Sequence, residues 1–215
     1  MYQYGERNNT LRVTHSDKST FPYVIIDDIY DEEELSLIYA ELNFIVQPYK
    51  YTDDAKEYGA KYDDGVTSKV NNYSIWLDDV YNNRIHSDIL RINRKIFDSN
   101  IYSLNSNWHI KKFFQLCNSD MTLISYYDNG GYYDYHTDQT AYTAITWFYK
   151  EPKKFSGGDL SLRYEDESYT IECMNNRALV FPSMIEHSVS EIIMEEKDSN
   201  RGNGRYSMIQ FVNLI

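Results

Sequence analysis

Two histidines and one aspartate in the second half of the chain have the residue types and spacing of a metal site. His136 and Asp138 are separated by a single residue, and His187 follows further along the chain. In an extended segment, residues i and i+2 point to the same side, so the first two side chains can reach one ion. A third ligand from a neighbouring strand would complete one face of its coordination sphere. Each histidine taken singly is more typical of a surface or core residue, but the set predicts a facial triad for non-haem iron(II).

A facial triad leaves coordination positions open, which decides what else the site can bind. A 2-oxo acid such as 2-oxoglutarate can chelate iron through its C1 carboxylate and keto oxygen, with one position left for dioxygen. Its far carboxylate would lie inside the protein, where an unpaired charge is costly. We predict Arg205 as its partner, because a planar guanidinium binds a carboxylate through two parallel hydrogen bonds. Ser207 would face the same side of a strand, and Tyr127 is a further candidate contact.

Short β-type runs separated by turn signals must position these residues. We predict strands at residues 121–127, 142–149, 159–164, 169–173, 177–181 and 206–214. Turn-forming residues at 128–131, 156–158 and 175–176 separate them, at the spacing of an antiparallel sandwich or barrel. The charged, glycine-containing stretch at 195–204 predicts a surface loop before the last strand.

The first half of the chain predicts one strand and two supporting helices. Residues 21–27 have a strand pattern, and the acidic run at 31–34 predicts the start of a helix. A long loop is predicted at 47–67, which is rich in Tyr, Asp, Lys and Gly. Apolar residues at helical spacing mark the two helices: Leu35, Ile38 and Leu42 in the first, and Ile85, Ile89, Ile92 and Ile96 in the second.

The length and composition of the chain indicate its class. A chain of 215 residues, 42% apolar and 16% aromatic, can bury a substantial core, so we predict a single domain over residues 1–215. Its helical support would span 21–110 and its β-core about 115–215. The N-terminal residues contain no apolar run suited to a signal peptide or a membrane span, so a soluble cytoplasmic protein is expected. The sequence leaves the oligomeric state open.

The charge and the remaining reactive side chains exclude several classes. A formal net charge of −12 repels phosphate backbones and disfavours a nucleic-acid partner. Cys117 and Cys173 have neither disulfide-like nor metal-like spacing and are expected to be buried thiols. Residues expected at the surface or in packing, without a metal, are His15, His86, His109 and the acidic pairs at 53–54 and 63–64.

At this point a resemblance becomes specific. The segment Tyr127-Asp-Asn-Gly-Gly-Tyr-Tyr133-Asp-Tyr-His136-Thr-Asp138 resembles the metal-binding signature of prolyl 4-hydroxylase-like proteins in the iron(II)/2-oxoglutarate-dependent dioxygenase superfamily. Residues 142–151, 155–160 and 177–183 resemble that family's core strands in the same order. The segment Arg205-Tyr-Ser-Met-Ile resembles the branch that uses arginine where many collagen-type members have lysine.

The resemblance covers residues 21 to 215 and implies a mainly β fold with supporting α-helices, a double-stranded β-helix or distorted jelly roll. It implies His136, Asp138 and His187 as iron ligands and catalytic residues. It also implies Fe(II), 2-oxoglutarate as co-substrate and dioxygen, with ascorbate as a candidate reductant.

Further roles follow from the same resemblance. Tyr127 corresponds to a tyrosine that contacts 2-oxoglutarate, and Tyr133 to an aromatic residue that borders the substrate. Phe148 occupies a strand position where some relatives have a 2-oxoglutarate-binding tyrosine. Trp147 alternates with Ile145 in a strand pattern, which favours packing on a sheet face and leaves substrate binding as the alternative.

The leading hypothesis is hydroxylation of a prolyl residue in a peptide or protein, with release of succinate and carbon dioxide. A second hypothesis is oxidation of a free amino acid, another protein side chain or a nucleobase. A third is a jelly-roll binding module without turnover, which the complete set of ligands and the arginine disfavours.

Overall fold

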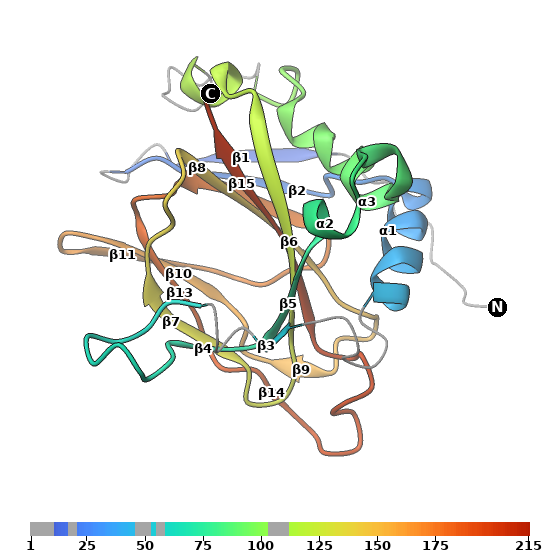
Figure 1. Cartoon of the computed structure of the whole chain (residues 1–215), viewed down its shortest axis with the longest axis vertical. Coiled ribbons are helices and arrows are strands. Elements are labelled where there is room, and N and C mark those ends of the chain that lie inside the picture. The colour runs from blue at the N-terminus through green and yellow to red at the C-terminus, as the bar shows by residue number, and fades with distance from the viewer. Residues whose placement is uncertain (1–10, 17–20, 46–52, 55–58, 103–111) are drawn as a thin grey trace.

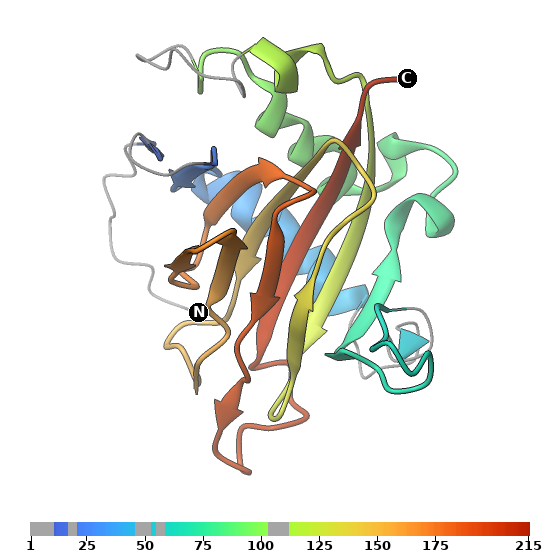
Figure 2. The same ribbon diagram turned by 90° about the vertical axis from the view of Figure 1, so that its left-hand side faces the viewer.

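The protein is built on two antiparallel sheets that face each other (Figures 1 and 2). The computed structural model describes residues 11–16, 21–45, 53–54, 59–102 and 112–215. In sheet order, the major sheet comprises β1 (Arg12–His15), β2 (Val24–Asp27), β12 (Arg177–Pro182), β8 (Tyr142–Phe148), β15 (Arg205–Asn213), β6 (Ser119–Tyr127), β5 (Tyr73–Trp76) and β3 (Asp53–Asp54). The minor sheet comprises β11 (Glu167–Ile171), β10 (Leu160–Tyr164), β13 (Glu186–Val189), β7 (Tyr132–His136) and β4 (Val70–Asn71). A separate pair joins β9 (Phe155–Ser156) to β14 (Ile193–Met194).

This arrangement is the double-stranded β-helix that the sequence predicts, and all six predicted strands of the second half are present with small shifts of their ends. Strands β7 and β13, which carry the two triad histidines, escaped the prediction because they are short and lack a clear apolar alternation. Strand β2 confirms the strand predicted at 21–27, whereas β3 and β5 were not predicted; all three extend the major sheet.

Strand β8 is buried on both faces, because the major sheet is covered on both sides. Ile145 and Trp147 belong to the apolar cluster between the two sheets, whereas Ala144 and Phe148 belong to the cluster between the major sheet and the helices. Successive side chains of a strand point to opposite faces, so this alternation follows from the pleat. The helices accordingly gather on one side of the molecule, opposite the minor sheet (Figure 1).

The first predicted helix is confirmed as α1 (Glu32–Ile45). Asp31 and Glu34 form a reciprocal capping box, in which each side chain accepts a hydrogen bond from the other residue's backbone N–H at 2.9 Å. Ile38 and Leu42 face the core as predicted, while Leu35 is only partly buried.

The second predicted helix is wrong as one continuous element. The structure has a series of short pieces: α2 (Leu77–Val80), η2 (Arg84–His86), α3 (Asp88–Ile92) and η3 (Asn93–Phe97), with η4 (Phe114–Leu116) further on. Ser87 separates η2 from α3 because its hydroxyl accepts a hydrogen bond from the Leu90 N–H at 3.0 Å, which caps a new helix start. The isoleucines at helical spacing predicted one continuous helix and did not indicate the break at Ser87.

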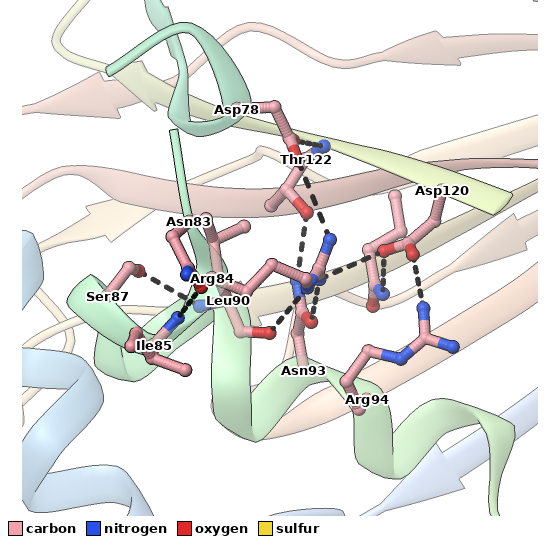
Figure 3. A network of polar contacts seen from close by, with 11 residues as sticks. Asp78, Asn83, Arg84, Ile85, Ser87, Leu90, Asn93, Arg94, Asp120 and Thr122 are labelled. Atoms are coloured by element: carbon pink, nitrogen blue, oxygen red, sulfur yellow. Dashed lines mark hydrogen bonds and ion pairs between the residues drawn. The ribbon is translucent and has the colours of Figure 1, made fainter. Parts of the chain in front are cut away.

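A polar network fastens these short helices to the end of β6 (Figure 3). The Asp120 side chain is 3% exposed and pairs with both Arg84 and Arg94. Arg84 also donates to Asn93 at 2.7 Å, and the Asn93 amide donates to the Thr122 hydroxyl at 2.9 Å. A buried carboxylate thus replaces apolar packing as the link between helices and sheet at this point.

The structure confirms some of the predictions about the loops and cysteines and corrects others. The stretch at 195–204 is a surface loop, as predicted, with residues 195–197, 200 and 201 exposed and Gly204 buried. The predicted loop at 47–67 lies partly outside the described residues, and its described part contains β3 and a turn closed by the bridge between Lys61 and Ser68. Both cysteines are free thiols; Cys173 is buried as expected, but Cys117 is only half-buried because it ends the exposed η4 turn.

The helices in the described part of the chain are all too short or too polar to cross a lipid bilayer.

The Asp120 network generates the first prediction. Asp120→Asn removes the charge that two arginines share, so the free energy of unfolding should fall by about 1–3 kcal/mol. Urea denaturation would measure the change. Glu195→Gln is the control, because Glu195 and Lys197 form a pair whose side chains are 72% and 71% exposed, and its loss should leave the free energy of unfolding nearly unchanged. Equal effects of the two substitutions would contradict the assigned role of Asp120.

Candidate metal centre

The two predicted histidines meet across the minor sheet. His136 ends β7 and His187 lies on β13, and the two are direct partners in the antiparallel register. Asp138 follows β7, and its backbone N–H donates to the Ser183 carbonyl at 3.0 Å. One ligand atom from each of these three side chains lies within 4.8 Å of the others. The structure therefore brings together the three residues that the sequence proposed as a metal site.

Both imidazoles have their coordinating nitrogen directed into the site. The Nδ1 atom of His136 lies 2.8 Å from the Asp134 carbonyl, and that of His187 lies 3.0 Å from the Ile185 carbonyl. A carbonyl oxygen can only accept, so each Nδ1 carries the proton and each Nε2 keeps its lone pair. These Nε2 atoms lie 3.9 and 3.5 Å from the Asp138 carboxylate oxygens.

The third ligand candidate is fixed by hydroxyl groups of the major sheet. The Thr143 hydroxyl donates to Asp138 Oδ2 at 2.5 Å and lies 2.8 Å from the Ser183 hydroxyl. Such a neighbour holds one carboxylate oxygen in place and leaves the other directed at the site. Asp138 is thereby oriented by Thr143 of β8 and by the carbonyl of Ser183, which directly follows β12.

The electrostatic environment favours the metal-binding form of His136. Burial, followed by the proximity of His187, lowers the pKa of His136 to about 3. The Tyr133 ring stacks on the His136 ring with a centroid distance of 3.5 Å and contributes to that burial. His136 is therefore neutral at physiological pH, as a metal ligand must be.

A cavity of about 170 Å³ opens on the triad. This is smaller than the roughly 300–1,000 Å³ of sites for drug-sized molecules, so it suits a small acid beside an ion. At one end the lining is polar, with Arg205, Ser207 and Tyr127. On the major sheet beyond the triad it is apolar, with the half-buried side chains Trp76, Leu123, Ile209 and Phe211.

Arg205 is a buried cation without a counter-ion. It is 1% exposed and forms no ion pair with any residue that the structure describes. Its Nε and Nη1 atoms, like the Ser207 hydroxyl, are buried without a hydrogen-bond partner among those residues. The guanidinium carbon lies 4.8 Å from the centre of the Tyr127 ring, so the three predicted co-substrate residues lie together. An unpaired buried charge is costly, and a bound carboxylate would remove that cost.

Tyr127 and Asn72 complete the polar end. Burial raises the pKa of the Tyr127 hydroxyl, and Arg205 and Asn72 partly offset that rise, so the phenol stays protonated and can donate. Asn72 is buried in the cavity wall, and its Oδ1 has no partner in the described part of the chain. Sequence reasoning missed Asn72 because it stands between two short strands, β4 and β5, in a region without a periodic signal.

The two aromatic positions on β8 have environments that the sequence did not settle. Phe148, at the strand position where some relatives have a 2-oxoglutarate-binding tyrosine, packs in the cluster on the helix side, because the pleat turns it away from the cavity. Trp147 points between the sheets, pairs in register with Ser207 and lies 5.7 Å from the Arg205 guanidinium carbon. Substrate binding by Trp147 stays a prediction, as does that by Tyr133, which does line the cavity.

Other candidate ligands lie apart from this centre. His86 is exposed, as expected, and Asp64 accepts hydrogen bonds within its own exposed turn, from Val66 and Thr67. His109 and the side chains of His15, Asp53 and Asp54 lie outside what the structure describes.

Comparisons with known proteins agree with this geometry. Residues 121–213 match the sequence model of the 2OG-Fe(II) oxygenase superfamily, a span that runs from β6 to β15 and includes the triad and Arg205. That superfamily implies Fe(II) and 2-oxoglutarate. No curated protein matches the chain by sequence.

Solved structures with the same fold include several prolyl hydroxylases. A Pseudomonas putida prolyl-4-hydroxylase has a TM-score of 0.56 and 15% identity, over 90% of this chain and 93% of its own. A prolyl hydroxylase from Trichoplax adhaerens, in complex with a hypoxia inducible factor peptide fragment, has a TM-score of 0.59 and 15% identity, over 90% and 84%. A viral collagen prolyl hydroxylase from Paramecium bursaria Chlorella virus-1 gives 0.51 and 11%, over 90% and 96%. The resemblance predicted from the sequence is confirmed, and the likeness to these structures is one of fold.

The triad generates a prediction that is independent of turnover. One divalent ion should bind per chain, measured by calorimetry with Mn(II), and Asp138→Ala should abolish this binding because a carboxylate ligand is removed. Asp134→Asn is the matched control, since the Asp134 side chain is hydrogen-bonded by Tyr62 rather than directed at the triad. Loss of binding in the control, or its retention in Asp138→Ala, would refute the assigned ligand set.

Proposed function

We propose that this protein is an iron(II)- and 2-oxoglutarate-dependent oxygenase that hydroxylates a prolyl residue in a peptide or protein. The observation that carries the proposal is the meeting, in one small cavity, of the triad with a buried arginine that lacks an anionic partner. His136, Asp138 and His187 would hold the iron. Bound iron, with 2-oxoglutarate and dioxygen, supplies the oxidising chemistry.

The polar end of the cavity would hold the far carboxylate of 2-oxoglutarate. Arg205 supplies the charge, and Ser207 lies on the same face of β15 with a free hydroxyl. We also propose a third donor, the indole N–H of Trp147, which is buried without a partner in the described part of the chain and belongs to the strand beside Ser207. A carboxylate at this position would accept hydrogen bonds from groups that otherwise have none, at no further cost of desolvation.

The opposite part of the cavity supports an apolar target residue. Trp76 and Phe211 pack against each other with a centroid distance of 5.3 Å, and Leu123 and Ile209 continue this surface. Within the described residues, Asp138 and Arg205 are the only acidic or basic side chains of the cavity wall besides the two triad histidines. A prolyl ring fits such a surface better than a lysyl or aspartyl side chain, whose charge would be desolvated without compensation. The peptide in the Trichoplax adhaerens complex supports a chain-like substrate by analogy of fold.

The proposed activity can be tested through its co-product. Iron-loaded protein exposed to air should convert 2-oxoglutarate to succinate, and proline-containing peptides should increase the rate and gain about 16 Da by mass spectrometry. Matched peptides with alanine in place of proline are the control. Stimulation by the alanine peptides alone would exclude the prolyl assignment, and the lack of any 2-oxoglutarate turnover would exclude the oxygenase.

The assigned role of Arg205 predicts a selective loss of co-substrate affinity. Arg205→Ala should weaken 2-oxoglutarate binding to Mn(II)-loaded protein by at least about thirtyfold, because one partner of a buried charge pair is removed. Binding of Mn(II) itself should persist. The affinity for 2-oxobutyrate, which lacks the far carboxylate, should change little, and an equal loss for both acids would contradict the contact.

Trp147→Phe tests the indole donor and keeps most of the apolar volume. It should weaken 2-oxoglutarate binding about tenfold or more, the effect of one hydrogen bond to a charged group. Trp76→Phe is the matched control, because Trp76 belongs to the apolar surface at the other end of the cavity. If both variants bind 2-oxoglutarate like the wild type, Trp147 is a packing residue.

A further inference from the structure

A second buried carboxylate, at the opposite end of β6 from Asp120, connects the 195–204 loop to the co-substrate end of the cavity. Asp128 directly follows β6 and is 8% exposed. It accepts hydrogen bonds from the Ser199 hydroxyl at 2.6 Å and from the Asn200 backbone N–H at 3.0 and 3.1 Å. Half of the loop's ten residues are exposed, but Ser199 and Asn200 attach it to the end of the core strand.

The same carboxylate is linked to the residue that precedes Arg205. The Tyr126 hydroxyl donates to Asp128 at 2.8 Å and accepts from the Gly204 N–H at 3.1 Å. Gly204 lies so close to β6 that a Cβ atom there would be 2.1 Å from the Tyr127 carbonyl oxygen. The loop therefore re-enters the sheet in one narrow position, immediately before Arg205.

This position fixes two proposed co-substrate contacts at once. Arg205 and Tyr127 are the first pair in the register between β15 and β6, and Asp128 is the next residue after Tyr127. A displacement of Gly204 would move the Arg205 backbone relative to the Tyr127 ring, which lies 4.8 Å from the guanidinium carbon. Because the guanidinium is buried between packed sheets, it cannot readily compensate by adopting another rotamer.

The ionised form of Asp128 suits this role. Burial by itself raises the pKa of Asp128, but hydrogen bonds from Ser199, Asn129, Tyr126 and Asn200 outweigh it and leave the pKa below the ordinary value. The surrounding groups are donors, so an amide at this position would direct its NH₂ group at one or more of them.

We propose that Asp128 is a positioning residue for 2-oxoglutarate: through Tyr126 and Gly204 it holds the 195–204 loop, and with it Arg205, in the orientation that binds the far carboxylate. This inference rests on the proposed function. Coupling between two sites is reciprocal, so bound 2-oxoglutarate should in turn order the loop.

The test compares two isosteric substitutions at the two ends of the same strand. Asp128→Asn should weaken 2-oxoglutarate binding to Mn(II)-loaded protein about tenfold or more and leave Mn(II) affinity unchanged, as measured by calorimetry. Asp120→Asn is the matched control: it breaks a carboxylate network at the end of β6 opposite to Tyr127 and Arg205, and should lower stability with unchanged 2-oxoglutarate affinity. Tyr126→Phe, which interrupts the same link without altering a charge, should weaken binding in the same direction by a smaller factor.

Hydrogen exchange supplies a second measurement. If Asp128 only stabilised the fold, 2-oxoglutarate would not change amide exchange in the loop. In the wild-type, Mn(II)-loaded protein, 2-oxoglutarate should slow amide exchange in residues 199–204, and this protection should be lost in Asp128→Asn. If Asp128→Asn does not fold, Tyr126→Phe and the wild-type exchange experiment decide the question. The inference would be overturned if Asp128→Asn bound 2-oxoglutarate with wild-type affinity, or if 2-oxoglutarate left amide exchange in the loop unchanged. Failure of the wild-type protein to bind 2-oxoglutarate at all would instead overturn the proposed function.

Discussion

The arrangement of this site depends on one guanidinium, which is buried between two sheets without an acidic partner among the described residues. Arg205 lies at the start of the central strand β15, where water cannot solvate it and no described carboxylate neutralises it. Natural proteins retain such a buried charge where a bound ligand neutralises it, since replacing the charge by an apolar group would stabilise the unliganded fold. The free donors of Ser207 and Trp147 beside it indicate a carboxylate as the missing group.

The triad is organised on the same principle of pre-arranged groups. Backbone carbonyls hold the Nδ1 protons of both histidines, and Thr143 holds one oxygen of Asp138. Little motion is then needed when an ion binds, because the lone pairs already converge. The triad and the co-substrate end of the cavity thus differ in origin: the histidines come from the minor sheet, whereas Arg205 comes from the major sheet.

Two buried carboxylates, one near each end of β6, provide directional contacts inside an acidic protein. Asp120 joins the short helices to one end of the strand through two arginines, and Asp128 joins the 195–204 loop to the other end through neutral donors. Both replace apolar packing with directional contacts. Such contacts define position more narrowly than apolar packing does, and at the Asp128 end that position is also that of Arg205.

The sequence by itself determined the β-rich second half, the capped first helix, and the identity of the triad and Arg205, because these depend on local periodicity and on short motifs with definite chemistry. It did not determine the helix break at Ser87, the buried Asn72 amide oxygen that lacks a partner among the described residues, or the hydrogen bonds between Asp128 and the 195–204 loop. Nor did it settle which of Trp147 and Phe148 points between the two sheets. Those features depend on which residues from distant segments become neighbours, and on a pleat whose phase is set only when β8 pairs with β15 and β12. One residue of slip would exchange the two faces, so only the tertiary structure could place the indole beside the arginine.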